Sequence, residues 1–269
     1  MRAKKSLGQN FLRDQSVIRR IVAALDLSEQ DTVIEIGPGR GALTEQLLAT
    51  GAKIVAIEID REFVPALRVQ FHFSENFQVV EADVLETDFA QYLPASGAAE
   101  TKLVGNLPYN ISTPILQRLI DQRELFSTIV LMFQREVVER IRASPGGKER
   151  GFLSVLVENA FDIKYLFDVR PQAFQPVPKV WSAVVRLTPK PFSLQDRPEF
   201  RNLVSAGFAQ KRKTILNNLK PVLDDATKIL AASGIDGKRR AETLTLHEWG
   251  VLATTIGKSG SPWPNGGSE

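Results

Sequence analysis

The sequence has no cysteine among its 269 residues and only two histidines, His72 and His247. The absence of cysteine excludes disulfides, a thiolate nucleophile and thiolate-bound zinc, and it makes a reducing cytoplasm the expected location. Neither histidine has a metal-ligand partner at a useful spacing, so no metal centre is expected.

Long apolar runs are also missing. No run approaches the length needed to span a bilayer, and residues 1–10 are basic and polar, without the apolar stretch of a signal peptide. We therefore expect a cytoplasmic protein with no membrane partner. A hydrophobic content of 43% is ample for the core of one large or two modest domains.

Charge is distributed unevenly, although the net charge is only +3. Residues 1–20 carry six Lys or Arg and one acid, residues 21–189 are acidic overall, and residues 190–258 are basic again. Basic flanks around an acidic middle favour a polyanion held at the edges of a catalytic body. Solvated helix faces would give the same pattern, so charge alone leaves both interpretations open.

Strand and helix patterns alternate along the first half of the chain. Apolar runs at residues 31–36, 53–57, 77–82, 103–105 and 128–133 read as strands, with amphipathic helices between several of them. This alternation predicts an α/β fold with a parallel, doubly wound, Rossmann-like sheet. Two later strands, 162–169 and 180–188, have no helix between them and predict an antiparallel edge on that sheet.

The double proline around Lys190 marks the expected domain boundary, because no strand pattern follows it. We predict a first domain over residues 1–189, which includes a helix at 152–161. Helices at 199–209, 213–219, 224–232 and 246–256 predict a small all-helical domain over residues 190–257. Residues 258–269 are rich in Gly, Ser and Pro and are expected to be disordered.

Three acids lie at the ends of three consecutive predicted strands: Glu35, Glu58 and Asp83. The first precedes a glycine-rich turn in which Gly37 and Gly39 let the backbone approach a ligand. The spacing differs from the turn that binds a pyrophosphate. Glu35 suits a cation, Glu58 the two hydroxyls of a ribose, and Asp83 an adenine amino group. The set favours S-adenosylmethionine over NAD, whereas helix-capping and solvated acids are the plain alternative.

The tetrad Asn106-Leu107-Pro108-Tyr109 follows the fourth predicted strand. The amide oxygen of Asn106 and the carbonyl of Leu107 can accept the two N–H groups of an aromatic amine, while Pro108 offers no backbone N–H. Tyr109 can stack on the base, which is worth roughly 1–3 kcal/mol. Alone, the tetrad favours a plain turn after a strand, and the donor pocket beside it reverses this preference.

Taken together, the run Gln9-Asn10-Phe11-Leu12, the turn at 35–41, Glu58, Asp83 and the tetrad resemble the ordered motifs of the ribosomal RNA adenine N6-dimethyltransferases. The resemblance covers nearly the whole chain, to about Ile256. Residues 174–182 and 208–219 are similar to the small-subunit (16S rRNA) branch in particular. The resemblance implies that the methyl donor is bound by Asn10, Leu12, Gly37, Glu58, Asp83 and Asn106. It also favours for Phe174 a role as a second stacking face for the target adenine, with ordinary core packing as the alternative.

The basic flanks are then candidates for phosphate contacts. They comprise Lys211, Arg212, Lys213, Arg239 and Arg240 in the helical region, and Arg2, Lys4, Lys5 and Arg13 at the other end. The implied partner is 16S rRNA in a small-subunit precursor, with the protein acting as a monomer.

Four alternatives remain open on the sequence. One is a large-subunit rRNA dimethyltransferase, and another is a DNA adenine methyltransferase, which more often has Asp-Pro-Pro-Tyr in place of the tetrad. The third is a non-catalytic RNA-binding assembly factor that descends from such enzymes. The fourth is an NAD oxidoreductase on the same fold, which the glycine spacing disfavours.

Overall fold

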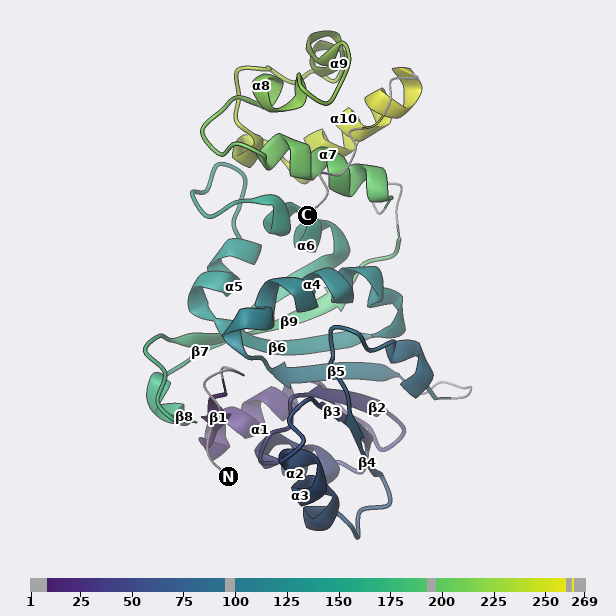
Figure 1. The fold of residues 1–269 in the computed structure, drawn as a ribbon, viewed down its shortest axis with the longest axis vertical. Coiled ribbons are helices and arrows are strands. Elements are labelled where there is room, and N and C mark those ends of the chain that lie inside the picture. Colours follow the sequence, from purple (N-terminus) through teal and green to yellow (C-terminus); the bar gives the residue numbers. More distant parts are fainter. Residues whose placement is uncertain (1–8, 95–99, 193–196, 260–262, 264–269) are drawn as a thin grey trace. The chain divides into compact units, whose positions relative to one another are not determined.

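The computed structural model describes residues 9–94, 100–192, 197–259 and 263, apart from the side chain of Tyr109 (Figure 1). The chain divides into two compact units. Met1–Val138 and Asp162–Pro189 form the first, and Glu139–Phe161 and Lys190–Glu269 form the second. Within the described part of the chain, no helix is both long enough and apolar enough to cross a membrane.

The first unit is built on a seven-stranded sheet in the order β4-β3-β2-β5-β6-β9-β7. Neighbours from β4 to β6 are parallel, and β9 is antiparallel to β6. This arrangement confirms the predicted parallel sheet with an antiparallel edge. The strands are β2 (Thr32–Ile36), β3 (Lys53–Glu58), β4 (Phe77–Glu81), β5 (Thr101–Asn106), β6 (Thr128–Gln134), β7 (Phe161–Val169) and β9 (Ser182–Pro189).

Helices cover both faces of this sheet, so β2 is buried at every position. One face packs Val33, Ile54 and Val104 into a core with α1 (Gln15–Ala23) and α2 (Ala42–Leu48). The chain steps outward in one direction through β2, β3 and β4, and in the other through β5 and β6. Right-handed crossovers therefore put α2 and α3 (Phe63–Gln70) on the face opposite α4 (Ser112–Asp121). The order reverses between β2 and β5, which is where ligand crevices form in such sheets.

A second, two-stranded sheet joins the N-terminal segment to a distant loop. In this sheet β1 (Phe11–Leu12) runs antiparallel to β8 (Phe174–Gln175), with Leu12 opposite Phe174. Asp14 then caps α1 by accepting from the backbone N–H of Ser16 at 2.9 Å. The sequence analysis did not anticipate β1, β8 or the helix α5 (Arg135–Ile141).

The second unit contains α6 (Phe152–Ala160), α7 (Pro198–Phe208), α8 (Ile215–Leu219), α9 (Ala226–Ala232) and α10 (Leu246–Ser259). Trp249 is fully buried at its centre and stacks on Phe208 with ring centroids 5.9 Å apart. The predicted domain boundary needs one correction, because α6 belongs to this unit and not to the first domain. The helix is buried on nearly every side and packs against α7 and α10.

The predicted disordered tail also needs a correction at its start, since residues 258 and 259 form the last turn of α10. Apart from Trp263, the remainder of residues 258–269 lies outside the described part of the structure.

Candidate active site

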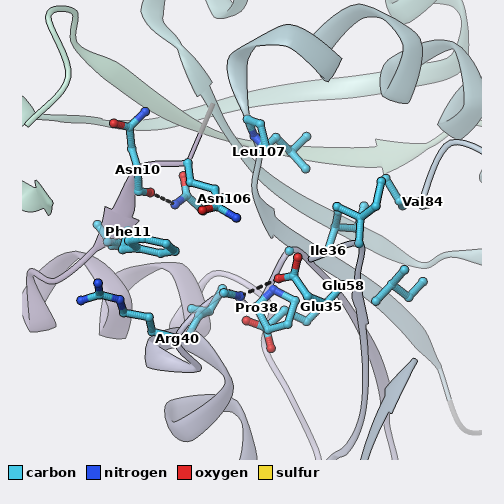
Figure 2. Close-up of a pocket in the computed structure, with 18 of the residues that line it drawn as sticks. Asn10, Phe11, Glu35, Ile36, Pro38, Arg40, Glu58, Val84, Asn106 and Leu107 are labelled. Carbon is cyan, nitrogen blue, oxygen red and sulfur yellow. Dashed lines mark hydrogen bonds between the residues drawn. The ribbon is translucent and has the colours of Figure 1, made fainter. Parts of the chain in front are cut away.

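A cavity of about 600 Å³ lies at the carboxyl ends of β2, β3, β4 and β5, beside the residues that precede α1 (Figure 2). All of the predicted donor-binding residues line it. They are Asn10, Leu12, Glu35, Gly37, Gly39, Glu58, Asp83 and Asn106. Leu107 and Pro108 of the tetrad line it too. The parallel sheet therefore brings to one place residues that are far apart in the sequence.

The glycine turn supplies backbone instead of side chains to this cavity. Gly37 and Gly39 have φ of +66° and +55°, which glycine adopts without strain. A Cβ on Gly37 would meet no other atom within 4 Å, whereas one on Gly39 would lie 3.1 Å from the ring of Phe11. Open space therefore lies beside the first glycine, and the second allows an aromatic side chain to approach the turn.

Glu58 is almost fully buried and is held through both carboxylate oxygens. Oε2 accepts from the backbone N–H of Gly39 at 2.9 Å (Figure 2). Oε1 accepts from the backbone N–H of Asp60 at 2.9 Å. Burial raises the pKa of Glu58, and these two backbone hydrogen bonds oppose the rise. Each oxygen retains acceptor capacity, so the carboxylate is oriented in advance for a pair of hydroxyl groups.

Glu35 is 1% exposed and accepts a hydrogen bond from the Thr44 hydroxyl at 2.7 Å. Burial raises its pKa to about 8, the charge of Glu58 adds to the rise, and the bond from Thr44 opposes it. Without a ligand the carboxyl is therefore mostly neutral at pH 7. A cation in the cavity would stabilise the charged form, whereas a phosphate would disfavour it. The electrostatics of this position suit a cationic ligand.

Asp83 follows β4 and is half-buried at the cavity. Its Oδ1 accepts from the backbone N–H of Leu85 at 2.8 Å, which fixes the carboxylate in an Asx-type turn. A fixed acceptor at the third strand end is the feature that the sequence predicted for contact with an adenine amino group.

Asn106 ends β5 and donates from Nδ2 to the carbonyl of Asn10 at 2.9 Å (Figure 2). Because the amide nitrogen is used in this way, Oδ1 is the atom available to accept a bond from a substrate. The backbone N–H of Leu107 donates to the carbonyl of Met132 at 3.3 Å, which anchors the tetrad to β6. Tyr109 opens a 3₁₀ turn, Tyr109–Ile111, but its side chain lies outside the described part of the structure.

The residues before α1 cross from one strand end to another. Gln9 donates to Asp60 Oδ2 at 2.9 Å, and the carbonyl of Asn10 holds Asn106. Phe11 packs edge-on against Phe63, and the Arg40 guanidinium lies 4.6 Å above its ring centroid. These contacts explain why residues 9–12 carry a motif that the apolar face of α1 does not require.

Phe174 occupies a core position in this structure. Its ring is 3% exposed and belongs to the core that contains Leu12, its cross-strand partner. It is not among the residues that line the cavity. The pairing of β8 with β1 thus places Phe174 in the core, which was the alternative to stacking. A stacking role for Phe174 stays a prediction.

The predicted phosphate contacts divide into two kinds. Lys211, Arg212 and Lys213 are exposed in the segment between α7 and α8, which we call the basic turn. Arg240 is half-exposed, with Glu242 at 3.8 Å. Arg239 instead donates to Glu248 and to the carbonyl of Thr243, and it lowers the pKa of Glu248 to about 2.

Arg239 therefore braces the start of α10 in this structure. At the other end of the chain, Arg13 lines the cavity and donates to Gln175. Arg2, Lys4 and Lys5 lie outside the described residues. Of the side chains that the structure describes, no group of three or more His, Asp and Glu is arranged to hold a metal ion.

With the strand order and this cavity in place, comparison with known proteins decides the family. The model of the family described as ribosomal RNA adenine dimethylase matches residues 1–257. The chain belongs to this family. It is therefore an S-adenosylmethionine-dependent rRNA adenine dimethyltransferase, and its substrate is ribosomal RNA. This membership removes the NAD and DNA alternatives.

Relatives and solved structures agree with this family. The chain is 44% identical to a ribosomal RNA small subunit methyltransferase A of Geobacter metallireducens, over 95% of this chain and 96% of the relative. It is 45% identical to the protein of that name in Geobacter sulfurreducens, over 94% of each. A dimethyladenosine transferase from Plasmodium falciparum superposes with a TM-score of 0.77 at 26% identity, covering 93% and 98% of the chains. The 23S rRNA methyltransferase ErmE gives 0.69 at 26%, covering 92% and 100%.

Proposed function

We propose that this protein adds two methyl groups to the N6 amino group of each of two adjacent adenosines in 16S rRNA, within a small-subunit precursor. The observation that carries the chemistry is the Asn106 amide, which its bond to Asn10 orients at an acid-lined cavity. The choice of subunit is supported by relatives of 44% and 45% identity that are named for the small subunit.

The side chains of the cavity match the functional groups of the methyl donor. Glu58 presents two fixed oxygens to a ribose diol, Asp83 an acceptor to an adenine amino group, and Glu35 a buried carboxyl to a cation. S-adenosylmethionine has all three features, and when bound it supplies a methyl group on a cationic sulfur that keeps the electrons of the broken bond.

The tetrad would hold the acceptor amine. An adenine amino group is a poor nucleophile because its lone pair is delocalised into the ring. When Oδ1 of Asn106 and the carbonyl of Leu107 accept its two N–H groups, the nitrogen becomes more tetrahedral and its lone pair can attack the methyl carbon. The new N–C bond makes the amine cationic, and it then loses a proton to water. Most of the acceleration therefore comes from positioning rather than from a strong base.

The second methylation constrains the same site. After the first transfer one N–H remains, so only one of the two acceptors stays engaged and the other must tolerate a methyl group. The first product must therefore turn or shift before the second transfer. Tyr109 would hold the base during both rounds by stacking, and we propose that Phe174 contributes a second stacking face.

Exposed cations would hold the RNA outside the cavity. The basic turn and Arg240 present cationic side chains to solvent, as phosphate binding requires. Lys4 and Lys5 are proposed for the same role. Arg239 retains this proposed role only if an RNA phosphate displaces Glu248 from its guanidinium. We further propose that the protein acts as a cytoplasmic monomer.

A strain that lacks the gene tests the function. Dimethylated adenosines would be mapped across the 16S and 23S rRNA of the deletion strain, with and without the restored gene. We expect two adjacent dimethyladenosines in 16S rRNA to disappear on deletion and to return on restoration. Loss confined to 23S rRNA would favour a large-subunit enzyme, the alternative that the structural similarity to ErmE supports. Loss at neither rRNA would contradict both.

A further inference from the structure

The segment that joins β8 to β9, residues 176–181, exposes three large apolar side chains within five residues. Val177 is 60% exposed, and Val180 and Trp181 are each 43% exposed. Single exposed apolar residues need no explanation, but a cluster that includes a tryptophan marks an interaction surface. The contrast with the fully buried Trp249 shows that this indole is not needed to fill a core.

The strand register places this segment at the same edge of the sheet as the tetrad. Gln134 of β6 pairs with Ser182, and the next backbone N–H, of Arg135, donates to the carbonyl of Trp181 at 3.0 Å. Asn106, on the neighbouring strand β5, pairs with Met132, which lies three residues before Arg135. With a rise of about 3.3 Å per residue and strands about 4.8 Å apart, the Trp181 backbone is roughly 14 Å from that of Asn106.

That separation suits a nucleotide near the one in the cavity. A stacked strand rises about 3.4 Å per nucleotide, so roughly 14 Å corresponds to no more than about four nucleotides. The cavity also borders this region, because Arg13 lines it and donates to Gln175, the residue just before this segment.

The charges beside Trp181 fit a nucleic acid. Lys179 is exposed two residues away. The Arg135 side chain is 54% exposed while it pairs with Asp168 at 3.8 Å, a separation at the limit of an ion pair. Single-stranded RNA is recognised by aromatic rings that stack on its bases and cations that contact its phosphates. An apolar protein partner would offer no counter-charge to the exposed Lys179.

We propose that Trp181 is a stacking platform for an unpaired nucleotide that flanks the target adenosine, with Lys179 and Arg135 holding the adjacent phosphates. The platform is separate from the tetrad, which holds the reacting base. The proposal rests on the proposed function, since it requires an RNA acceptor that reaches the cavity as a single strand.

Three variants of the full-length protein test the platform. Trp181→Ala removes the ring, Trp181→Phe retains a smaller one, and Phe73→Ala removes an even more exposed aromatic, 88% exposed, from the turn after α3. Dissociation constants for a 16S rRNA transcript, KM and kcat for small-subunit precursor particles, affinity for S-adenosylmethionine and thermal melting would be measured for each. RNA-induced quenching of tryptophan fluorescence in the wild type gives a direct readout of stacking.

We expect Trp181→Ala to weaken RNA affinity and raise KM by about 10-fold, which is within the range for loss of one base–aromatic stack. Its kcat, donor affinity and melting temperature should stay at wild-type values, and part of the fluorescence quenching should disappear. Trp181→Phe should recover most of the affinity, and Phe73→Ala should behave as wild type.

RNA affinity of Trp181→Ala within twofold of wild type would overturn the proposal, even if wild-type methylation of 16S rRNA is intact. So would a fall in melting temperature that accounts for the loss of affinity, or a loss that Trp181→Phe does not restore. Absence of methylation by the wild-type protein on any rRNA would instead remove the proposed function on which the platform depends.

Discussion

Replacing Glu35 by glutamine tests whether the donor cavity contains a carboxyl that is kept neutral by burial. The pKa of Glu35 is raised from 4.5 to about 8, chiefly because the side chain is buried. Below pH 4.5 the carboxyl is protonated in both the folded and the unfolded chain, so its burial does not lower the free energy of unfolding through ionisation. Between pH 4.5 and 8 only the unfolded chain releases the proton, and the free energy of unfolding falls as pH rises.

The magnitude follows from the same shift. Each pH unit in that window is worth about 1.4 kcal/mol, so at pH 7 the cost of burying Glu35 is on the order of 3 kcal/mol. Glutamine has no proton to lose, and its amide oxygen can still accept from the Thr44 hydroxyl. We therefore expect Glu35→Gln to be as stable as the wild type at pH 4.5 and more stable by about 3 kcal/mol at pH 7.

Urea unfolding at pH 5, 6, 7 and 8 measures this difference. The free energies of unfolding of the variant and the wild type should diverge by about 1.4 kcal/mol per pH unit, and the divergence should level off near pH 8. Glu75→Gln is the matched control, because Glu75 is exposed and its variant should follow the wild-type curve at every pH. Parallel curves for Glu35→Gln and the wild type would refute the reasoning.

Binding of the methyl donor provides a second test of the neutral Glu35 carboxyl. If Glu35 faces a cation in the filled cavity, binding of S-adenosylmethionine at pH 7 should release up to one proton from the wild-type protein. Calorimetry in two buffers of different ionisation enthalpy would detect it. The Glu35→Gln protein should release none and should bind the donor more weakly.

Three further predictions concern other parts of the chain. The free energy of unfolding of Phe174→Leu should lie within about 1.5 kcal/mol of the wild-type value, since leucine nearly conserves the core volume. Its rate of methyl transfer should fall at least about 10-fold if the ring stacks on the base, and full activity in transfer assays would leave Phe174 only its core role. Lys102→Met should lower the free energy of unfolding by about 3 kcal/mol, because it leaves Asp31, now 3.0 Å from the Lys102 ammonium, buried without its cation; unchanged urea midpoints would contradict this. Alanines throughout the basic turn should reduce the slope of log affinity for RNA against log salt by about 2, and an unaltered slope would exclude phosphate contacts there.

Periodicity was sufficient to predict the central sheet. The strands β2, β3 and β6 are long apolar runs with helices between them, and parallel strands buried on both faces produce this pattern. The two-residue strands β1 and β8 are too short to show any period, so only the folded chain reveals them. The apolar pattern of α6 predicted burial, but a helix pattern does not say which neighbour buries it.

The candidate site also has a part that the sequence predicted and a part that only the structure reveals. Glu58 and Asp83 end predicted parallel strands, and the carboxyl ends of such strands meet at one edge, so their meeting was predictable. The orientation of Asn106 was not, because it depends on the carbonyl of Asn10, which is 96 positions away in sequence. The platform residue Trp181 was also missed. Its exposure beside β6 has no signature in a single sequence, although an aromatic residue among Pro, Val and Lys was a possible signal.

The transfer of labelled methyl groups to purified small-subunit precursors by the Asn106→Ala protein tests the central claim most directly. Loss of the Asn106 acceptor should reduce the rate by about 100-fold or more, as for other groups that act on the reacting atoms. The melting temperature and S-adenosylmethionine binding should show that the variant is folded and that its donor cavity is largely intact. Gln91→Ala, which removes an amide from an exposed 3₁₀ turn, should transfer methyl groups at the wild-type rate. A folded Asn106→Ala protein that also did so would contradict the account.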